Sequence, residues 1–129
     1  MLLRKYMSLL GIGSAKIDLI LPKEKYKLGE QINGYFLLKG GTIEQQLKRI
    51  DCDLICIDKQ GESEKVIDSV TILTSKCIES EETNQMPFTF TLPASIPFVT
   101  EDVSFRFTTR LTFNEGVKSI DQDFIEIVQ

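Results

Sequence analysis

Hydrophobic and polar residues alternate most regularly over Val103–Phe113. Alternate positions of this stretch carry large apolar side chains, with one interruption at Thr109: Val103, Phe105, Phe107, Leu111 and Phe113. The positions between them carry hydroxyls and two arginines: Ser104, Arg106, Thr108, Arg110 and Thr112. Side chains alternate between the two faces of a β-strand, so the pattern predicts a strand with its aromatic face in a core and its polar face in solvent.

Weaker alternation predicts further strands before and after this stretch: Lys16–Leu21, Ile32–Leu38, Val66–Ile78, Gln85–Leu92 and Phe124–Val128. The connections between them contain glycines, and we expect Gly29 and Gly116 to have positive φ. Gly40 and Gly41 predict a two-residue hairpin turn of type I′, because that turn requires positive φ at both central positions.

The segment that follows Gly41 fits either a helix or a strand. Ile43, Leu47 and Ile50 have helical spacing, and residues 44–49 have good helix composition. We favour a strand, because the predicted hairpin would deliver the chain into an antiparallel partner. The apolar residues Ile43 and Leu47 have odd numbers, whereas the later ones have even numbers: Ile50, Cys52, Leu54 and Cys56. A β-bulge near Lys48–Ile50 would produce this change.

The first residues have the spacing of a short amphipathic helix that ends at Gly11 or Gly13. Its apolar side would consist of Leu2, Leu3, Tyr6, Leu9 and Leu10. The helix would either cover its own domain or dock a second subunit, a partner or a membrane surface. We therefore expect a helix over residues 1–14 and one all-β domain over residues 15–129, an antiparallel β-sandwich of about seven strands.

Composition excludes several functional classes. The chain of 129 residues has a net charge of −4, which argues against nonspecific binding to nucleic acid. It has no His, so it lacks the commonest general base and the commonest metal ligand. Its three cysteines are an odd number, which suits a reducing compartment, and we expect a cytoplasmic protein. No apolar run has the length of a transmembrane segment.

Three segments together resemble the bacterial sporulation-control proteins of the arrestin-like superfamily. The opening similarity covers Gly11-Ile12-Gly13-Ser14-Ala15-Lys16-Ile17-Asp18, then Tyr26-Lys27-Leu28-Gly29-Glu30, Gly34 and Gly40-Gly41. The next covers Phe88-Thr89-Phe90-Thr91-Leu92-Pro93, with Pro97 four residues on, and the last covers Ser119-Ile120-Asp121-Gln122-Asp123-Phe124-Ile125-Glu126-Ile127. The order and spacing of the segments make the similarity fairly specific.

This resemblance implies an immunoglobulin-like antiparallel β-sandwich of arrestin type. It implies a non-catalytic regulatory or adaptor protein that binds other proteins and acts in control of sporulation or cell differentiation. Members of the family usually carry two such domains in tandem, and the similarity here covers the first. Functions that need both domains are therefore not carried over. A homodimer that covers the surface of the second domain is a further hypothesis.

Cysteine and aspartate pairs offer possible metal or acid/base sites. Cys52 and Cys56 would lie about 13 Å apart on one strand face, too far to bridge each other. Buried, inert thiols are a better interpretation than a zinc site with Cys77. The pairs Asp51/Asp53 and Asp121/Asp123 could hold Ca²⁺ or act as a carboxylate dyad, but solvated strand faces are the favoured interpretation.

Arg106 and Arg110 would share the polar face of the central strand. They fit either cross-strand ion pairs or a basic patch that recognises an acidic partner segment. Together with the apolar side of the N-terminal helix they are the candidate partner-binding residues. We identify no catalytic, cofactor-binding or metal-binding residue and expect no cofactor.

The favoured function is thus a protein-interaction module. The alternative is a small-molecule or carbohydrate-binding β-sandwich module, and an enzyme is a more distant third possibility. A polar cavity between the sheets would favour the ligand-binding module, whereas a filled core with an open, apolar edge would favour the adaptor.

Overall fold

A computed structural model describes residues 14–58, 63–96, 102–114, 116 and 118–128 of the chain. These residues contain strands and connections but no helix, so the all-β prediction is confirmed for them. The strands are β1 (Lys16–Ile20), β2 (Lys25–Lys27), β3 (Gln31–Lys39), β4 (Gln45–Asp58), β5 (Glu64–Leu73), β6 (Cys77–Ile78), β7 (Thr83–Thr91), β8 (Val103–Phe113) and β9 (Lys118–Val128).

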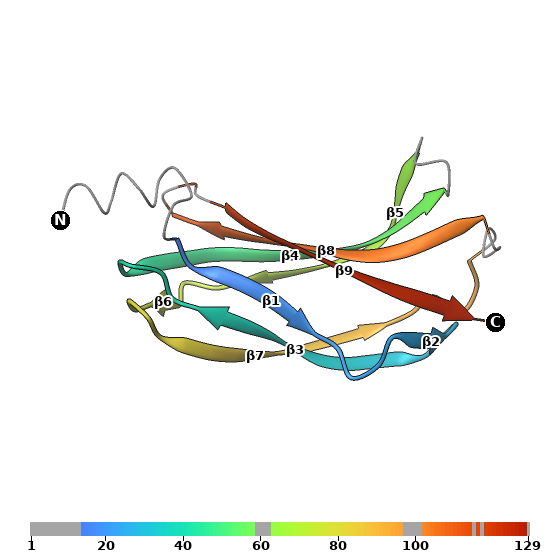
Figure 1. Ribbon diagram of the computed structural model, residues 1–129, viewed down its shortest axis with the longest axis horizontal. Helices are drawn as coiled ribbons and strands as arrows, with labels where there is room; N and C mark the ends of the chain where they lie inside the picture. The colour runs from blue at the N-terminus through green and yellow to red at the C-terminus, as the bar shows by residue number, and fades with distance from the viewer. Residues whose placement is uncertain (1–13, 59–62, 97–101, 115, 117, 129) are drawn as a thin grey trace.

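The strands form two open sheets that pack face to face (Figure 1). The smaller sheet has the order β1-β3-β7, and the larger has the order β2-β9-β8-β4-β5, with β6 paired to β4. Pairing is antiparallel throughout except between β2 and β9, which are parallel. β1 lies against β9, so β7 and β5 border the opposite side of the sandwich.

The aromatic face of β8 forms the centre of the core, as the alternation predicted. Phe107 is fully buried, and its ring meets Phe88 and Phe90 edge to face at centroid distances of 5.6 and 5.2 Å. Phe36 approaches Phe88 in the same way at 5.1 Å. Such pairs add to the stabilisation that burial of the rings provides. Thr109 also points into this core and contacts the sulfur of Cys52, with 3.5 Å between Oγ1 and Sγ.

The choice of a strand for the ambiguous segment is confirmed, because β4 runs without interruption from Gln45 to Asp58. Its register against β8 shifts between Leu47 and Arg49, which is the predicted bulge. The expectation that a hairpin delivers the chain into β4 beside the preceding strand was wrong, however. The partners of β4 are β8, β5 and β6, and the segment before it belongs to the other sheet.

The hairpin predicted at Gly40 and Gly41 is therefore wrong. Neither glycine has positive φ, and β3 pairs with β1 and β7 rather than with β4. Gly40 is needed for a steric reason instead, because a Cβ atom there would lie 2.1 Å from the carbonyl oxygen of Glu79. Its N–H donates to the carbonyl oxygen of Glu82. A glycine at this position allows the two backbones to approach each other closely.

The positive φ values predicted for Gly29 and Gly116 are confirmed, at 79° and 81°. Several strand boundaries differ from prediction. The stretch Val66–Ile78 is divided into β5 and β6, and β9 begins six residues before the predicted start at Phe124. The short strands β2 and β6 were not predicted, and they raise the number of strands from about seven to nine in the described ranges.

The predicted N-terminal helix, with its apolar residues Leu2, Leu3, Tyr6, Leu9 and Leu10, lies outside the described residues except for Ser14, which belongs to no helix. Nothing in the described ranges tests that prediction. None of the described residues belongs to a helix with the length and apolarity that a membrane span requires.

Candidate functional site

The outer face of β9 exposes three large apolar side chains, of which Ile120 and Phe124 are more exposed than Val128. Ile125 and Ile127 point into the core, so the alternate residues Ile120 and Phe124 point outward, with 61% and 63% of their surface exposed. The pairing of β9 with β8 places Ile120 opposite Arg110 and Phe124 opposite Arg106. We call these four residues the β9 patch.

The two arginines of the β9 patch are held by ion pairs across the larger sheet. Nη2 of Arg110 lies 2.9 Å from Oδ2 of Asp53 on β4, and Nη2 of Arg106 lies 2.8 Å from Oε1 of Glu64 on β5. The Arg106 side chain is only 14% exposed, whereas that of Arg110 is 38% exposed. Arg110 is therefore the more accessible cation beside the apolar pair.

The aspartates of β4 lie on the outer face of the sheet, but they are paired and mostly covered rather than freely solvated as expected. Asp53 is buried and accepts hydrogen bonds from Ser69 and Arg110, at 2.7 and 2.9 Å. Asp51 forms a two-point pair with Arg49 on its own strand and accepts a bond from Thr71. The Arg49 guanidinium lowers the pKa of Asp51 below its usual range. These carboxylates stabilise the outer face of the sheet.

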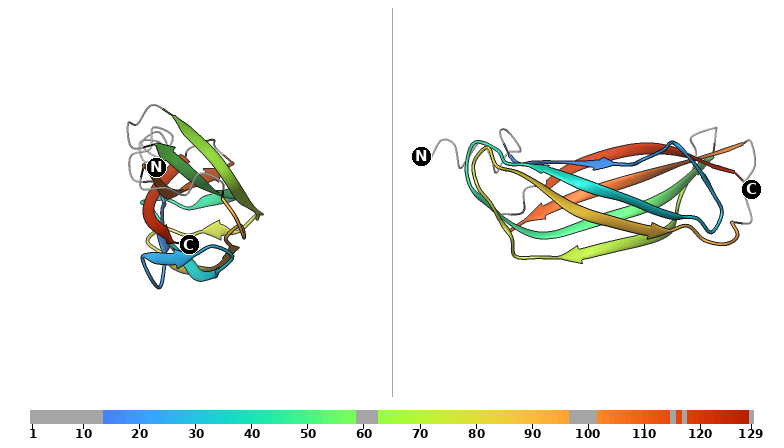
Figure 2. Two further views of the ribbon diagram at one scale, coloured as in Figure 1. Left: turned by 90° about the vertical axis from the view of Figure 1, so that its right-hand side faces the viewer. Right: turned by 90° about the horizontal axis from the view of Figure 1, so that it is seen from below.

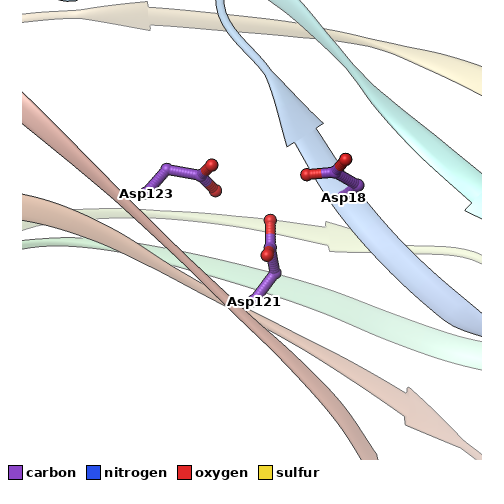
Figure 3. A group of neighbouring side chains, drawn as sticks. All are labelled: Asp18, Asp121 and Asp123. Atoms are coloured by element: carbon purple, nitrogen blue, oxygen red, sulfur yellow. The ribbon is translucent and has the colours of Figure 1, made fainter.

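A second cluster of carboxylates lies where β1 meets β9, and Figure 3 shows it. Asp121 and Asp123 were expected on a solvated face, but they point from β9 toward Asp18 on β1. Their ligand atoms all lie within 4.8 Å of one another. Oδ2 of Asp121 also accepts a hydrogen bond of 2.9 Å from the backbone N–H of Leu19. The cluster therefore connects the two sheets.

Proximity changes the protonation of this cluster. Burial raises the pKa of Asp123 to about 7, and hydrogen bonding and repulsion from Asp121, with repulsion from Asp18, add to the effect. Burial raises the pKa of Asp18, and repulsion from and hydrogen bonding with Asp121 raise it further, while the positive charge of Lys39 lowers it. Oδ2 of Asp123 is covered and has no hydrogen-bond partner among the described residues. Chemically, three such carboxyls can share a proton or offer oxygen ligands to a hard divalent cation.

A surface hollow of about 380 Å³ adjoins the cluster. It is lined by Leu19, Leu21, Pro22, Lys23, Glu24, Asp123 and Phe124. A second hollow, of about 480 Å³, contains Ser14, Gly40 and Gly41 in its lining. The linings of both hollows include exposed residues, so both hollows lie at the surface. Between the sheets, by contrast, side chains such as Phe107, Leu54 and Ile32 have no exposed surface. The interior is thus filled with side chains at these positions.

The cysteines have two different environments. Cys52 and Cys56 are buried on the inner face of β4, and burial raises the pKa of the Cys52 thiol to about 12 and raises that of Cys56. Such thiols are poor nucleophiles because the thiolate is the reactive form. The burial expected for Cys52 and Cys56 is confirmed, whereas Cys77 on β6 is exposed.

Sequence reasoning found the arginines of the β9 patch but missed its apolar half. The signal was present, because Phe124 and Ile125 are adjacent in the sequence. On a strand, two neighbouring residues face opposite sides, so one large apolar side chain had to point away from the core. The structure brings Arg106 and Arg110 together with Phe124 and Ile120, and the N-terminal candidates lie outside the described residues.

Comparisons with known proteins identify relatives along nearly the whole chain. The family described as SpoOM protein matches residues 3–129. The sporulation-control protein spo0M of Bacillus subtilis (strain 168) is 34% identical over 128 residues, which cover 95% of this chain and 50% of that protein. The chain therefore spans about half the length of the curated relative that it matches.

Solved structures give the same relationship. The crystal structure of Spo0M from Bacillus subtilis superposes with a TM-score of 0.80 at 35% identity, covering 92% of this chain and 51% of that one. A cycloisomaltooligosaccharide glucanotransferase from Paenibacillus sp. superposes with a TM-score of 0.59 at 12% identity, covering 90% of this chain and 14% of the enzyme. The second likeness is one of fold alone.

Proposed function

Because the chain belongs to the SpoOM protein family, as the resemblance in its sequence predicted, we propose that it is a regulatory protein of bacterial sporulation control that acts by binding other proteins. In this proposal its two sheets form a sandwich of arrestin type, it catalyses no reaction, and it works in the cytoplasm. The relative named for sporulation control is about twice as long, so this chain would contribute one part of the activity that the name describes.

The observation that supports protein binding best is the exposure of Ile120 and Phe124 on one strand face. Aromatic side chains and arginine are enriched in protein interfaces, and an exposed aliphatic neighbour adds apolar area. Arg110, partly exposed next to Ile120, would direct acidic groups of a partner to this face. We therefore propose the β9 patch as the contact surface for an apolar partner segment flanked by carboxylates.

Replacing Phe124 with alanine is expected to weaken capture of that partner by about tenfold, because the variant loses an interface anchor. The measurement is quantitative affinity capture from sporulating cells, followed by titration calorimetry with the protein that is recovered. Gln122→Ala is the matched control, since Gln122 is exposed on the same face between Ile120 and Phe124. Equal recovery of every captured protein by the two variants would contradict the proposed surface.

The candidate residues of the N-terminal segment need a separate variant. Deletion of residues 1–13 removes Leu2, Leu3, Tyr6, Leu9 and Leu10 together. If that segment docks a partner, the deletion reduces recovery even with the β9 patch intact. Retention of all partners would limit the contact surface to the β-sandwich.

A further inference from the structure

The surface hollow beside the carboxylate cluster lies where the chain passes from the smaller sheet to the larger. β1 belongs to the smaller sheet and β2 to the larger, and residues 21–24 connect them along one side of the hollow. In the described ranges β2 pairs only with Glu126–Val128 of β9, so it does not cover the edge of β9 at Asp123 and Phe124. Figure 2 shows β1 and β9 side by side along one margin of the molecule. The hollow therefore opens to solvent at this margin.

Hydrogen bonds fix the connection that forms the rim of the hollow. The buried Tyr26 donates its hydroxyl to the carbonyl oxygen of Lys23 at 2.9 Å and accepts the N–H of the same residue at 3.2 Å. The N–H of Glu126 on β9 donates to the carbonyl oxygen of Glu24 at 2.8 Å. A site whose walls are already in place loses less conformational freedom when a ligand binds. The rim of the hollow is thus preformed.

The walls of the hollow combine apolar side chains with carboxyl groups. Phe124 is 63% exposed, Pro22 is exposed and Leu21 is half-buried. Asp123 and Glu24 supply the carboxyls, and the volume of about 380 Å³ lies within the usual range of small-ligand sites. A guanidinium group suits such walls, because it is planar, stacks on aromatic rings and pairs with a carboxylate through two N–H groups. A hydrated metal ion would use the oxygens but not the ring.

Four carboxyl groups lie in the hollow or next to it: Glu24, Asp123, Asp18 and Asp121. Oδ2 of Asp123 is covered and has no hydrogen-bond partner among the described residues. Burial and the two neighbouring aspartates raise the pKa of Asp123 to about 7, so near neutral pH this carboxyl is only partly ionised. A cation that enters the hollow would stabilise the ionised form. Binding of a cation would therefore release a proton.

The basic residues around the hollow do not supply that cation. None of those described forms an ion pair with a carboxyl of the lining. Lys23 belongs to the lining but pairs with Glu30, and Lys39 on β3 acts on Asp18. Two further cations are paired on the outer surface: Lys25 with Glu126 and Arg106 with Glu64. A cation from another molecule would thus be complementary in charge to the hollow.

We propose that the hollow binds an arginine side chain of the partner segment that contacts the β9 patch. Its guanidinium would stack on the ring of Phe124 and pair with the carboxylate of Asp123. Glu24 at the rim would be a second acceptor for its N–H groups. The proposal rests on the proposed function, since the arginine belongs to the partner, but it adds a binding site that the β9 patch does not include.

The arginine site gives the contact surface two ends of opposite charge. Arg110 lies beside Ile120 at one end, and the carboxyl of Asp123 adjoins Phe124 at the other. On a strand, the separation of Ile120 and Phe124 corresponds to about 13 Å. An extended partner segment would therefore carry an acidic residue and an arginine about four positions apart, with apolar residues between them. The two ends would fix the direction of the segment along β9.

NMR titration of the full chain with N-acetyl-arginine amide tests the hollow without an identified partner. We expect saturable shifts of the side-chain signals of Leu21 and Phe124, which line the hollow. N-acetyl-citrulline amide is the control ligand, because it has the same shape without the charge, and it should bind about tenfold more weakly. Binding of the arginine probe should tighten by about tenfold from pH 6 to pH 8, because Asp123, with a pKa of about 7, becomes ionised over this range.

Two variants identify the carboxyl that is responsible. Asp123→Asn is expected to weaken binding of the arginine probe by about tenfold at pH 8 and to abolish its dependence on pH. Glu126→Gln is the matched control, because it removes a negative charge from an exposed position of the same strand outside the hollow. This control should keep both the affinity and its pH dependence. A variant that only altered the packing of β9 would change the affinity at every pH alike.

Equal binding of the two probes, binding that does not change between pH 6 and pH 8, or equal binding by the two variants would each overturn the proposal. Tighter binding of Ca²⁺ alone than of the arginine probe would assign the hollow to a metal ion and overturn it as well. Failure of the proposed function gives a different result. Phe124→Ala and Gln122→Ala would then capture partners equally, while the unmodified chain still bound the arginine probe.

Discussion

Replacing Phe107 with alanine is expected to lower the free energy of unfolding by about 3–5 kcal/mol, which is the usual cost of truncating a buried phenylalanine. The Phe107 side chain has no exposed surface, and its ring is in contact with Phe88 and Phe90 of the opposite sheet. The variant loses both edge-to-face contacts and leaves a cavity between the sheets. Urea denaturation followed by far-UV circular dichroism measures the change.

The chain offers a matched control for this substitution. Phe124→Ala removes the same atoms from the neighbouring strand, but this ring lies on the outer face and is 63% exposed. We expect its free energy of unfolding to change by no more than about 0.5 kcal/mol. Similar losses in the two variants would mean that Phe107 is not the centre of the core. The same control also keeps any loss of partner binding by Phe124→Ala separate from a loss of folding.

The strand pattern was predictable because it depends on neighbours in the sequence. The alternation over Val103–Phe113 identified β8 with its full bounds, and the change of parity near Lys48–Ile50 identified a bulge. Both signals come from side chains a few residues apart. The sequence likewise identified Gly29 and Gly116, whose positive φ values depend on the local turn alone.

The pairing of the strands was less predictable because it depends on distant residues. Gly40 and Gly41 have the sequence of a hairpin turn, yet the chain there passes from one sheet to the other. What makes a glycine necessary at residue 40 is the backbone of Glu79, which is nearly forty residues further along the chain. The strand β2 has three residues and pairs with the end of β9, so neither its length nor its local pattern predicts it.

The same distinction applies to the candidate sites. One exposed side chain of the β9 patch could have been inferred from the adjacent apolar residues Phe124 and Ile125. The carboxylate cluster could not, because Asp18 precedes Asp121 by more than one hundred residues. The alternation of β9 places Asp121 and Asp123 on its inner face, but only the position of β1 shows that another carboxylate is opposite.

That cluster predicts an unusual dependence of stability on pH. The chain has no His, so few of its groups titrate between pH 5 and pH 7 in the unfolded state. In the folded protein the pKa of Asp123 is about 7, compared with about 4 in an unfolded chain. Between these two values the folded state binds more protons than the unfolded state. The contribution of Asp123 to stability is therefore fully present below the unfolded pKa and is lost as the pH rises through the folded one.

The expected loss is about 1.4 kcal/mol in the free energy of unfolding from pH 5 to pH 8. The interval between pH 5 and the folded pKa corresponds to about 2.7 kcal/mol, and solvent screening of this partly exposed carboxyl reduces it by about half. Asp51, whose pKa is lowered, acts in the opposite direction, but its contribution is lost only in more acidic solution. Urea denaturation at a series of pH values measures the slope.

Asp123→Asn is expected to abolish most of this slope, because an amide stays neutral throughout the range. Its stability at pH 8 should be close to that of the unmodified chain at pH 5. Glu24→Gln is the control, since Glu24 lines the same surface hollow and is exposed. That variant removes the same charge outside the cluster and should retain the slope. An unchanged slope in Asp123→Asn would assign the pH dependence to another group.

The direction of the slope also distinguishes the two kinds of chemistry that the cluster allows. A divalent cation binds carboxylates only when they are deprotonated, so a bound cation would make stability rise with pH. Proton sharing among Asp18, Asp121 and Asp123 makes stability fall over the same range. Denaturation in a chelator and in excess Ca²⁺ separates the two cases. A negative slope in both solutions assigns the cluster to proton sharing, and a positive slope that appears only with Ca²⁺ assigns it to cation binding.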